Sequence, residues 1–375
     1  MALGISDHFN GTTFFQPGAH PERGFREVLK WKLTSRSARW PRHVPLVPHG
    51  PVPEPAGDEL VITWLGHASF LLRTTAGNVL FDPVFSDRVS PFPWIGPRRV
   101  QPPPLTIDTL PSIDVVCVSH DHYDHCDVDT LHALATRFDP LFVAPLRHAD
   151  LLRSAGAHRI AELDWWESHV ARPGLRVTLT PAKHWSNRLG TPRNHRLWGG
   201  MMVEFSISDF RFSIAELGSC RAGGSTPRSA SGADEQNPRL ARHPVEGGSR
   251  AEIENQKSKI ENPVRRLWFV GDTGYDARLG RDVAERCGAP DVVLMPIGAY
   301  EPRWFMAPMH MNPEEAVRLH RDVGARLSVA MHWGTFQLTD EARDEPVKAL
   351  ETARAAAGVS PAEFRVIDAG QSVVG

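Results

Sequence analysis

The chain has 375 residues, of which 41% are hydrophobic and 23% charged, enough for one large globular domain or two small ones. Acidic and basic residues nearly cancel, at 44 against 42, so the chain has no overall positive field of the kind expected of a nucleic-acid-binding protein, and any charged partner must be recognised locally. Its four cysteines are scattered without a CxxC pair, so a disulfide framework is not expected and a reducing compartment fits best.

The N-terminal stretch "MALGISDHFNGTTFFQPG" has no basic start followed by an apolar core. No stretch approaches the ~20 apolar residues that a membrane span requires. We therefore expect a cytoplasmic protein with no nucleic-acid partner. A peripheral membrane contact and a homodimer are both compatible with the sequence.

Composition divides the chain into three parts. Residues 1–56 are rich in proline, arginine and aromatic residues, and they predict an arm that wraps the domain, with one short helix around Phe25–Leu33. The main domain is expected to span residues 57–375. Within it, residues 221–262 contain almost no large apolar side chains and predict a mobile surface insertion that carries no catalytic residue.

Short β-rich runs that end in turn residues begin at Glu59. They predict strands within residues 60–66, 69–74, 78–83, 113–120, 141–145 and 176–184. Helical patterns alternate with later runs and predict helices within residues 127–138, 276–288 and 312–324. This order indicates an α/β protein in which sheets pack together under helical layers.

The last of these helices has the clearest boundaries. Asn312 suits the N-cap, Pro313 suits the first helical position, and Glu315 completes a capping box. Gly324 provides the stop. The sequence therefore predicts a well-defined helix between these residues.

The segment "VSHDHYDHCD" follows the apolar run "IDVVCV" directly. His120, His122, Asp124 and His125 form the pattern HxHxDH in it. A lone exposed His-Asp pair would usually be a solvated turn. Four such residues after a buried strand exceed what one catalytic zinc takes from a single segment, because that ion uses three protein ligands and keeps a position for water. The pattern therefore predicts two metal ions.

Three isolated residues elsewhere share one context. His184, Asp272 and His332 each stand at the end of an apolar run and precede a turn-like or aromatic residue. Taken singly, each would suit a structural role. The repetition favours an edge at which several strands end and place their ligands together.

These motifs resemble those of the metallo-β-lactamase superfamily of dinuclear metallohydrolases. More closely, "WLGHASFLL", "SHDHYDHCD", "PAKHWSNR", "FVGDTGY", "IGAYEPRWFM" and "HWGTFQL" resemble the N-acylphosphatidylethanolamine-hydrolysing phospholipase D family. The similarity runs from about residue 8 to residue 373, apart from the polar insertion. It implies an αβ/βα sandwich of two packed mixed sheets flanked by helices. It also implies two Zn²⁺ ions at one end of the sheets, with Mn²⁺ or Fe²⁺ as alternatives.

The resemblance also assigns the metal ligands. It implies that the first ion is held by His120, His122 and His184, the second by Asp124, His125 and His332, and both by a bridging Asp272. Imidazole nitrogen and carboxylate oxygen are ligands that zinc accepts, and a bridging carboxylate suits ions about 3.5–4 Å apart.

Four further positions match the family outside the ligand set. Asp82 suits either an orienting role towards a ligand imidazole or a plain Asp-Pro turn. For His67 we favour a structural turn histidine. His310 is expected to face the substrate and to move a proton near neutral pH. Tyr123 suits substrate contact and packing equally.

The resemblance implies a phosphodiesterase of the phospholipase D type that acts on N-acylphosphatidylethanolamine-like phospholipids. A water or hydroxide between the metals would attack phosphorus. Asp124, Asp272 and His310 are the expected catalytic residues. Metal binding without catalysis would be marked by an incomplete ligand set, and every expected ligand is present.

The same site could instead serve a small-molecule lactone, ester or amide, since one fold hosts many substrates. Arginine recognises phosphate bidentately, so the orientation of Arg188, Arg193 and Arg303 distinguishes the two hypotheses. An arginine that faces the metals favours the phosphodiester. A pocket without basic groups favours the alternative.

Overall fold

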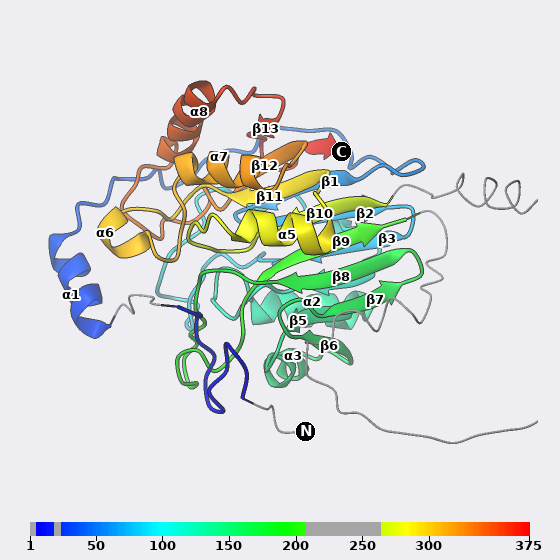
Figure 1. Ribbon diagram of the computed structural model, residues 1–375, viewed down its shortest axis with the longest axis horizontal. Coiled ribbons are helices and arrows are strands. Elements are labelled where there is room, and N and C mark those ends of the chain that lie inside the picture. The colour runs from blue at the N-terminus through cyan, green and yellow to red at the C-terminus, as the bar shows by residue number, and fades with distance from the viewer. Residues whose placement is uncertain (1–4, 19–23, 207–263) are drawn as a thin grey trace, which may run out of the picture.

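The computed structural model describes residues 5–18, 24–206 and 264–375. Two sheets lie face to face, and helices cover their outer sides (Figure 1). The predicted insertion at residues 221–262 lies outside the described residues, so that prediction stays open.

The first sheet is mixed. Its first three strand pairings are antiparallel and its last three are parallel. In spatial order its strands are β14 (Ser372–Val374), β1 (Val61–Gly66), β2 (Ser69–Thr74), β3 (Gly77–Phe81), β4 (Val115–Cys117), β5 (Leu141–Pro145) and β6 (Arg159–Leu163).

The second sheet combines the same two kinds of pairing in the reverse order. Parallel pairings join its first four strands and antiparallel pairings the remainder. In spatial order its strands are β13 (Phe364–Arg365), β12 (Leu327–Met331), β11 (Val292–Pro296), β10 (Arg265–Phe269), β9 (Gly200–Phe205), β8 (Leu175–Thr180) and β7 (Ser168–Arg172).

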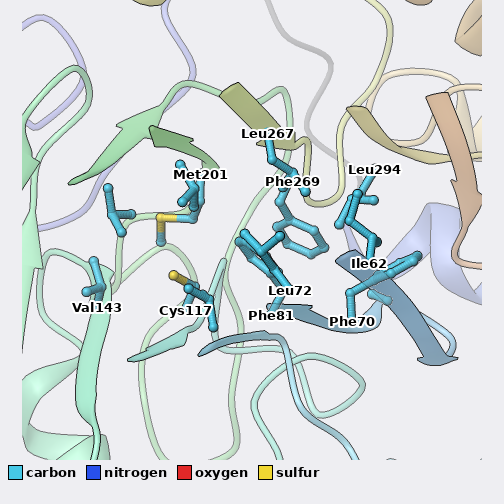
Figure 2. Close-up of a cluster of buried hydrophobic side chains, with 14 of the residues drawn as sticks. Ile62, Phe70, Leu72, Phe81, Cys117, Val143, Met201, Leu267, Phe269 and Leu294 are labelled. Carbon is cyan, nitrogen blue, oxygen red and sulfur yellow. The ribbon is translucent and has the colours of Figure 1, made fainter. Parts of the chain in front are cut away.

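Apolar side chains from the inner faces of both sheets fill the space between them (Figure 2). Phe81 of β3 stacks on Phe269 of β10, with ring centroids 5.0 Å apart. Neither residue is exposed to solvent. Because every strand alternates its side chains, the outer faces carry separate apolar clusters that the helices cover.

In the described part of the chain, five helices lie over these outer faces. The outer cluster of the first sheet takes side chains from α2 (Val128–Phe138) and α3 (Ala149–Ser154). The outer cluster of the second sheet takes them from α5 (Leu279–Cys287), α7 (Pro313–Asp322) and α8 (Glu345–Ala357). The capping prediction for α7 is confirmed, since Asn312 accepts a hydrogen bond from the backbone N–H of Glu315 at 2.9 Å. The predicted α/β sandwich of two mixed sheets under helices is therefore confirmed.

Within the N-terminal arm, α1 (Phe25–Thr34) forms at the predicted helix and lies beyond one end of the sheets (Figure 1). Trp31 stacks on Phe305 of α6 (Arg303–Met306), with centroids 5.1 Å apart. Trp40 donates to the backbone carbonyl of Glu341 at 2.9 Å. The domain boundary at residue 57 stays a prediction. Among the described residues no helix is long and apolar enough to cross a membrane.

Candidate metal centre

The seven predicted ligands meet at one end of the two sheets, because each follows a strand that ends there. The segment that holds four of them begins just after β4, His184 follows β8, Asp272 follows β10, and His332 directly follows β12. Residues 120–126, here called the metal-binding turn, include a turn in which Cys126 donates its backbone N–H to the carbonyl of His122 at 2.8 Å. The turn projects several side chains of one short segment into the same space.

Three imidazoles form the first group. His120 Nε2 lies 2.9 Å from His122 Nδ1, and His184 Nε2 lies 3.2 Å from the same atom. A tetrahedral zinc with bonds of about 2.0–2.1 Å needs nitrogen ligands roughly 3.3 Å apart. The spacing of the three nitrogens therefore fits one ion.

Two imidazoles and a carboxylate form the second group. His125 Nε2 lies 3.2 Å from His332 Nε2, and each lies 3.5 Å from Asp124 Oδ2. These donors also meet the spacing that a tetrahedral ion needs. His67 belongs to the same group in space, since its ligand atom lies within 4.8 Å of the other three.

Asp272 lies between the two groups. Its Oδ2 is 3.2 Å from His125 Nε2 and 3.7 Å from His184 Nε2, while its Oδ1 is 3.2 Å from His332 Nε2. It therefore approaches ligands of both predicted ions, which is the position that a bridging carboxylate requires.

Several predicted ligands have protonation states that suit metal binding. Burial would raise the pKa of Asp272, but His125 and His332 beside it hold that pKa well below its usual value. Burial lowers the pKa values of His120 and His184 well below the ordinary histidine value. Ionised carboxylates and neutral imidazoles are the forms in which these groups coordinate a metal. Burial would lower the pKa values of His125 and His332, but Asp272 and Asp124 raise both above the ordinary histidine value, so a bound ion would displace a proton from these two imidazoles.

The donor set itself fits divalent cations. Asp272 Oδ1 is buried and receives no hydrogen bond within the described part of the chain, although buried polar atoms normally have a partner. Two ionised carboxylates and several imidazole nitrogens that face one another are costly to bury without compensating charge. Bound cations would supply that charge.

Asp82 directly follows β3 and contacts a predicted ligand. It accepts hydrogen bonds from His125 Nδ1 at 2.6 Å, from the backbone N–H of Ser119 at 2.7 Å and from the Ser119 hydroxyl at 2.5 Å. The Ser119 hydroxyl lies 2.9 Å from His120 Nδ1. The Asp82 carboxylate lies against the imidazole of the predicted ligand His125, as the first of the two interpretations requires. The backbone φ of Asp82 is 36°. Such a conformation persists where the surroundings enforce it.

His67 is more than a turn histidine. Its Nε2 lies 3.0 Å from Asp124 Oδ2, and its carbonyl accepts the backbone N–H of His332 at 3.0 Å. Burial lowers the pKa of its imidazole to about 3, with the neighbouring His332 contributing. A structural role therefore explains the backbone contact of His67. It does not explain the side chain, whose neutral imidazole lies against the predicted ligand Asp124.

His310 and Tyr123 have different surroundings. His310 Nδ1 lies 3.8 Å from Asp272 Oδ2, and its ring meets that of His184 edge-on at 5.0 Å. The Tyr123 hydroxyl accepts the backbone N–H of Leu189 at 3.1 Å, and its ring packs against the apolar cluster around Phe336. His310 is thus placed beside the candidate metal centre, whereas Tyr123 contacts Leu189, Arg188 and the apolar cluster around Phe336.

The orientation of three arginines distinguishes the two substrate hypotheses, and two of them hydrogen-bond to protein groups. The Arg303 guanidinium donates to the His310 carbonyl at 2.9 Å and to Glu315 at 2.8 Å. Arg188 donates to backbone carbonyls of the metal-binding turn. The exposed Arg193 lies over Trp185, 5.5 Å from its ring centroid, and that ring contacts His122 at 4.8 Å.

The sequence does not single out the residues that brace the ligands. Ser119 connects Asp82 with His120, and the carbonyl of Met309 lies 3.1 Å from His184 Nδ1. Asp121, buried inside the motif, bonds to Arg196 at 3.2 Å. Its place between His120 and His122 is a signal that could have found it, because a carboxylate buried in a metal motif needs a partner.

Comparison with known proteins agrees with this geometry. The family model described as a beta-lactamase superfamily domain matches residues 77–215 and 234–333. An uncharacterized Mycobacterium tuberculosis protein is 35% identical over 335 residues, which cover 86% of this chain and 72% of that protein. The N-acyl-phosphatidylethanolamine-hydrolyzing phospholipase D 1 of Caenorhabditis elegans is 32% identical over 323 residues, 83% of this chain and 75% of the relative. A solved metallo hydrolase of Ignicoccus hospitalis shares the fold, with 20% identity, a TM-score of 0.52 and coverage of 84% and 98% of the two chains.

Proposed function

This chain belongs to the beta-lactamase superfamily and is a metal-dependent hydrolase of that fold, and we propose that it is a dinuclear zinc phosphodiesterase of the phospholipase D type. The proposed substrates are N-acylphosphatidylethanolamine-like phospholipids. The observation that carries the dinuclear site is Asp272, whose two oxygens approach His125, His184 and His332. The relative from Caenorhabditis elegans supports the substrate class.

The chain's residues would divide the work between two ions. His120, His122 and His184 would hold one, and Asp124, His125 and His332 would hold the other. When bound, two such ions lower the pKa of a water and neutralise charge on phosphoryl oxygens. Asp272 lies between the two groups and would offer a carboxylate oxygen to each.

Residues around the ligands would set orientation and proton transfer. Asp82 holds the His125 ring through Nδ1, so that Nε2 faces the centre. His310 is buried, and burial lowers the pKa of its imidazole to about 4. It would therefore be neutral at physiological pH and able to take a proton from water or to donate a hydrogen bond to the leaving group.

Hydrolysis of a small-molecule lactone, ester or amide at the same centre is the second candidate. The observation in its favour is that the guanidiniums of Arg188 and Arg303 hydrogen-bond to protein groups. Arg193 lies beside Trp185 at the surface, with its guanidinium 5.5 Å from the ring centroid.

Parallel hydrolysis assays test the proposal. Zinc-loaded protein would be incubated with N-acylphosphatidylethanolamine vesicles, a small phosphodiester and a panel of lactones, with the His122→Ala variant as control. The proposal predicts release of an N-acylethanolamine and phosphatidic acid, which H122A does not support. Cleavage of lactones with no cleavage of either phosphodiester would select the second candidate instead.

A further inference from the structure

Arg188 reaches both ends of the metal-binding turn. One nitrogen, Nη1, donates to the carbonyl of Asp121 at 2.9 Å and to the carbonyl of Cys126 at 3.0 Å. These two residues bracket His122, Tyr123, Asp124 and His125. A single guanidinium nitrogen with two hydrogens therefore spans a segment that carries three of the seven predicted ligands.

The ring of Tyr123 supports the same guanidinium. The Arg188 guanidinium carbon lies 4.2 Å from the centroid of that ring, a distance typical of cation–π contact. The Tyr123 hydroxyl in turn accepts the backbone N–H of Leu189. Arg188 and Tyr123 thus hold each other across two separate segments, which fixes the plane of the guanidinium.

The backbone that carries Arg188 is itself anchored. Asn187 donates its backbone N–H to Asp121 Oδ1 at 2.9 Å, and Thr191 donates to the Arg188 carbonyl at 3.1 Å. Asn194 donates its backbone N–H to the Ser186 carbonyl at 2.8 Å, which closes the loop that holds Arg188. The same segment begins at His184, a predicted ligand of the first ion. Arg188 therefore connects a ligand of the β8–β9 connection with those of the metal-binding turn.

We propose that Arg188 is a positioning residue that clamps the metal-binding turn and fixes the spacing of its ligands. The proposal rests on the metal site of the proposed function but not on its substrate. The contacts commit one nitrogen of this guanidinium to protein carbonyls instead of a phosphate. They also explain why lysine is not equivalent, because an ammonium lacks the planar fork and its cation–π contact differs.

A rival explanation predicts the opposite sign. A guanidinium beside two divalent cations repels them, so its removal would strengthen metal binding if charge were its main effect. Two variants separate these effects. Arg188→Lys keeps the charge but loses the fork, whereas Arg188→Gln loses both.

The test is zinc affinity, measured by competition with a chromophoric chelator for wild type, R188K and R188Q. The clamp predicts that both variants bind zinc about tenfold more weakly or worse, as substitutions behind metal ligands commonly do. It also predicts a changed visible spectrum after Co²⁺ substitution, since the ligand geometry shifts. Arg318→Gln is the matched control, because Arg318 is exposed on α7 and pairs with Glu314.

Each outcome decides the question. Tighter zinc binding by R188Q, or wild-type affinity and an unchanged Co²⁺ spectrum in both variants, would overturn the clamp. Reduced thermal stability of the metal-free variants with unchanged zinc affinity would assign Arg188 a merely structural role and also overturn it. If R188Q does not fold, R188K decides alone. Absence of zinc binding by the wild type would instead refute the proposed function.

Discussion

His125 Nδ1 lies 2.6 Å from Asp82 Oδ2, and neither side chain is exposed to solvent. This contact fixes the tautomer of a predicted metal ligand, because a proton on Nδ1 leaves Nε2 free to coordinate. Asp82→Asn should weaken zinc binding by about 10–100-fold, the range known for such outer partners. Zinc titration against a competing chelator measures the change.

Asp108→Asn provides the matched control, since Asp108 is exposed and pairs with Arg137 at the surface. D108N should bind zinc like the wild type. Equal zinc affinity in D82N and D108N would show that Asp82 shapes only its local Asp-Pro turn and does not support zinc binding.

His310 should affect the reaction more than metal binding. It lies beside Asp272 and His184 but belongs to neither predicted ligand triad. His310→Gln should lower kcat by about 10²–10⁴-fold, the usual contribution of a general acid or base, with the metal content unchanged. Steady-state kinetics and elemental analysis of the same sample check this. Loss of one metal per chain in H310Q would make His310 a ligand instead.

The packing of Phe269 between the two sheets should contribute strongly to the free energy of unfolding. Phe269 is fully buried and stacks on Phe81 across the interface. Phe269→Ala should lower the free energy of unfolding by about 3–5 kcal/mol, through lost burial and the remaining cavity. Denaturant unfolding measures it, and Phe92→Ala, at a side chain that is 42% exposed, is the control. A similar small loss in both variants would contradict the packing account.

The N-terminal arm should loosen as pH rises. His8 lies between two carboxylates, 2.6 Å from Asp7 and 2.7 Å from Asp164. Burial would lower the pKa of His8, but its hydrogen bonds to Asp164 and Asp7 raise that pKa above the ordinary value. Because the folded pKa exceeds the unfolded one, this stabilisation is complete below about pH 6.5 and is lost as pH rises through the folded pKa.

His8→Gln measures that contribution. The Tm difference between wild type and H8Q should be larger at about pH 6 than at about pH 9, since only the protonated imidazole gains from both carboxylates. A difference that is constant or grows with pH would contradict this assignment.

Much of the geometry of the candidate site could be predicted because the predicted ligands follow recognisable strands. The apolar runs before His184, Asp272 and His332 became β8, β10 and β12, and their ends meet at one edge. Ligand type and local spacing are properties of short segments, so the sequence contains them. The fold class follows from the same alternation of strands and helices.

The bracing contacts could not be predicted in this way. Asp82 and His125 are 43 residues apart, and Arg188 is 67 residues from Asp121. Such pairs depend on how separate connections pack after the strands assemble. The left-handed backbone conformation of His67, Asp82 and His332 could not be predicted from the sequence either, because histidine and aspartate seldom adopt it.

The number of metal ions per chain tests the central claim most directly. Protein loaded with excess zinc and freed of unbound ions should contain two zinc ions per chain by elemental analysis. His122→Ala should contain fewer, while His158→Ala, at an exposed histidine outside the centre, should retain two. Wild-type protein without bound metal, or equal zinc content in H122A and the wild type, would contradict the account.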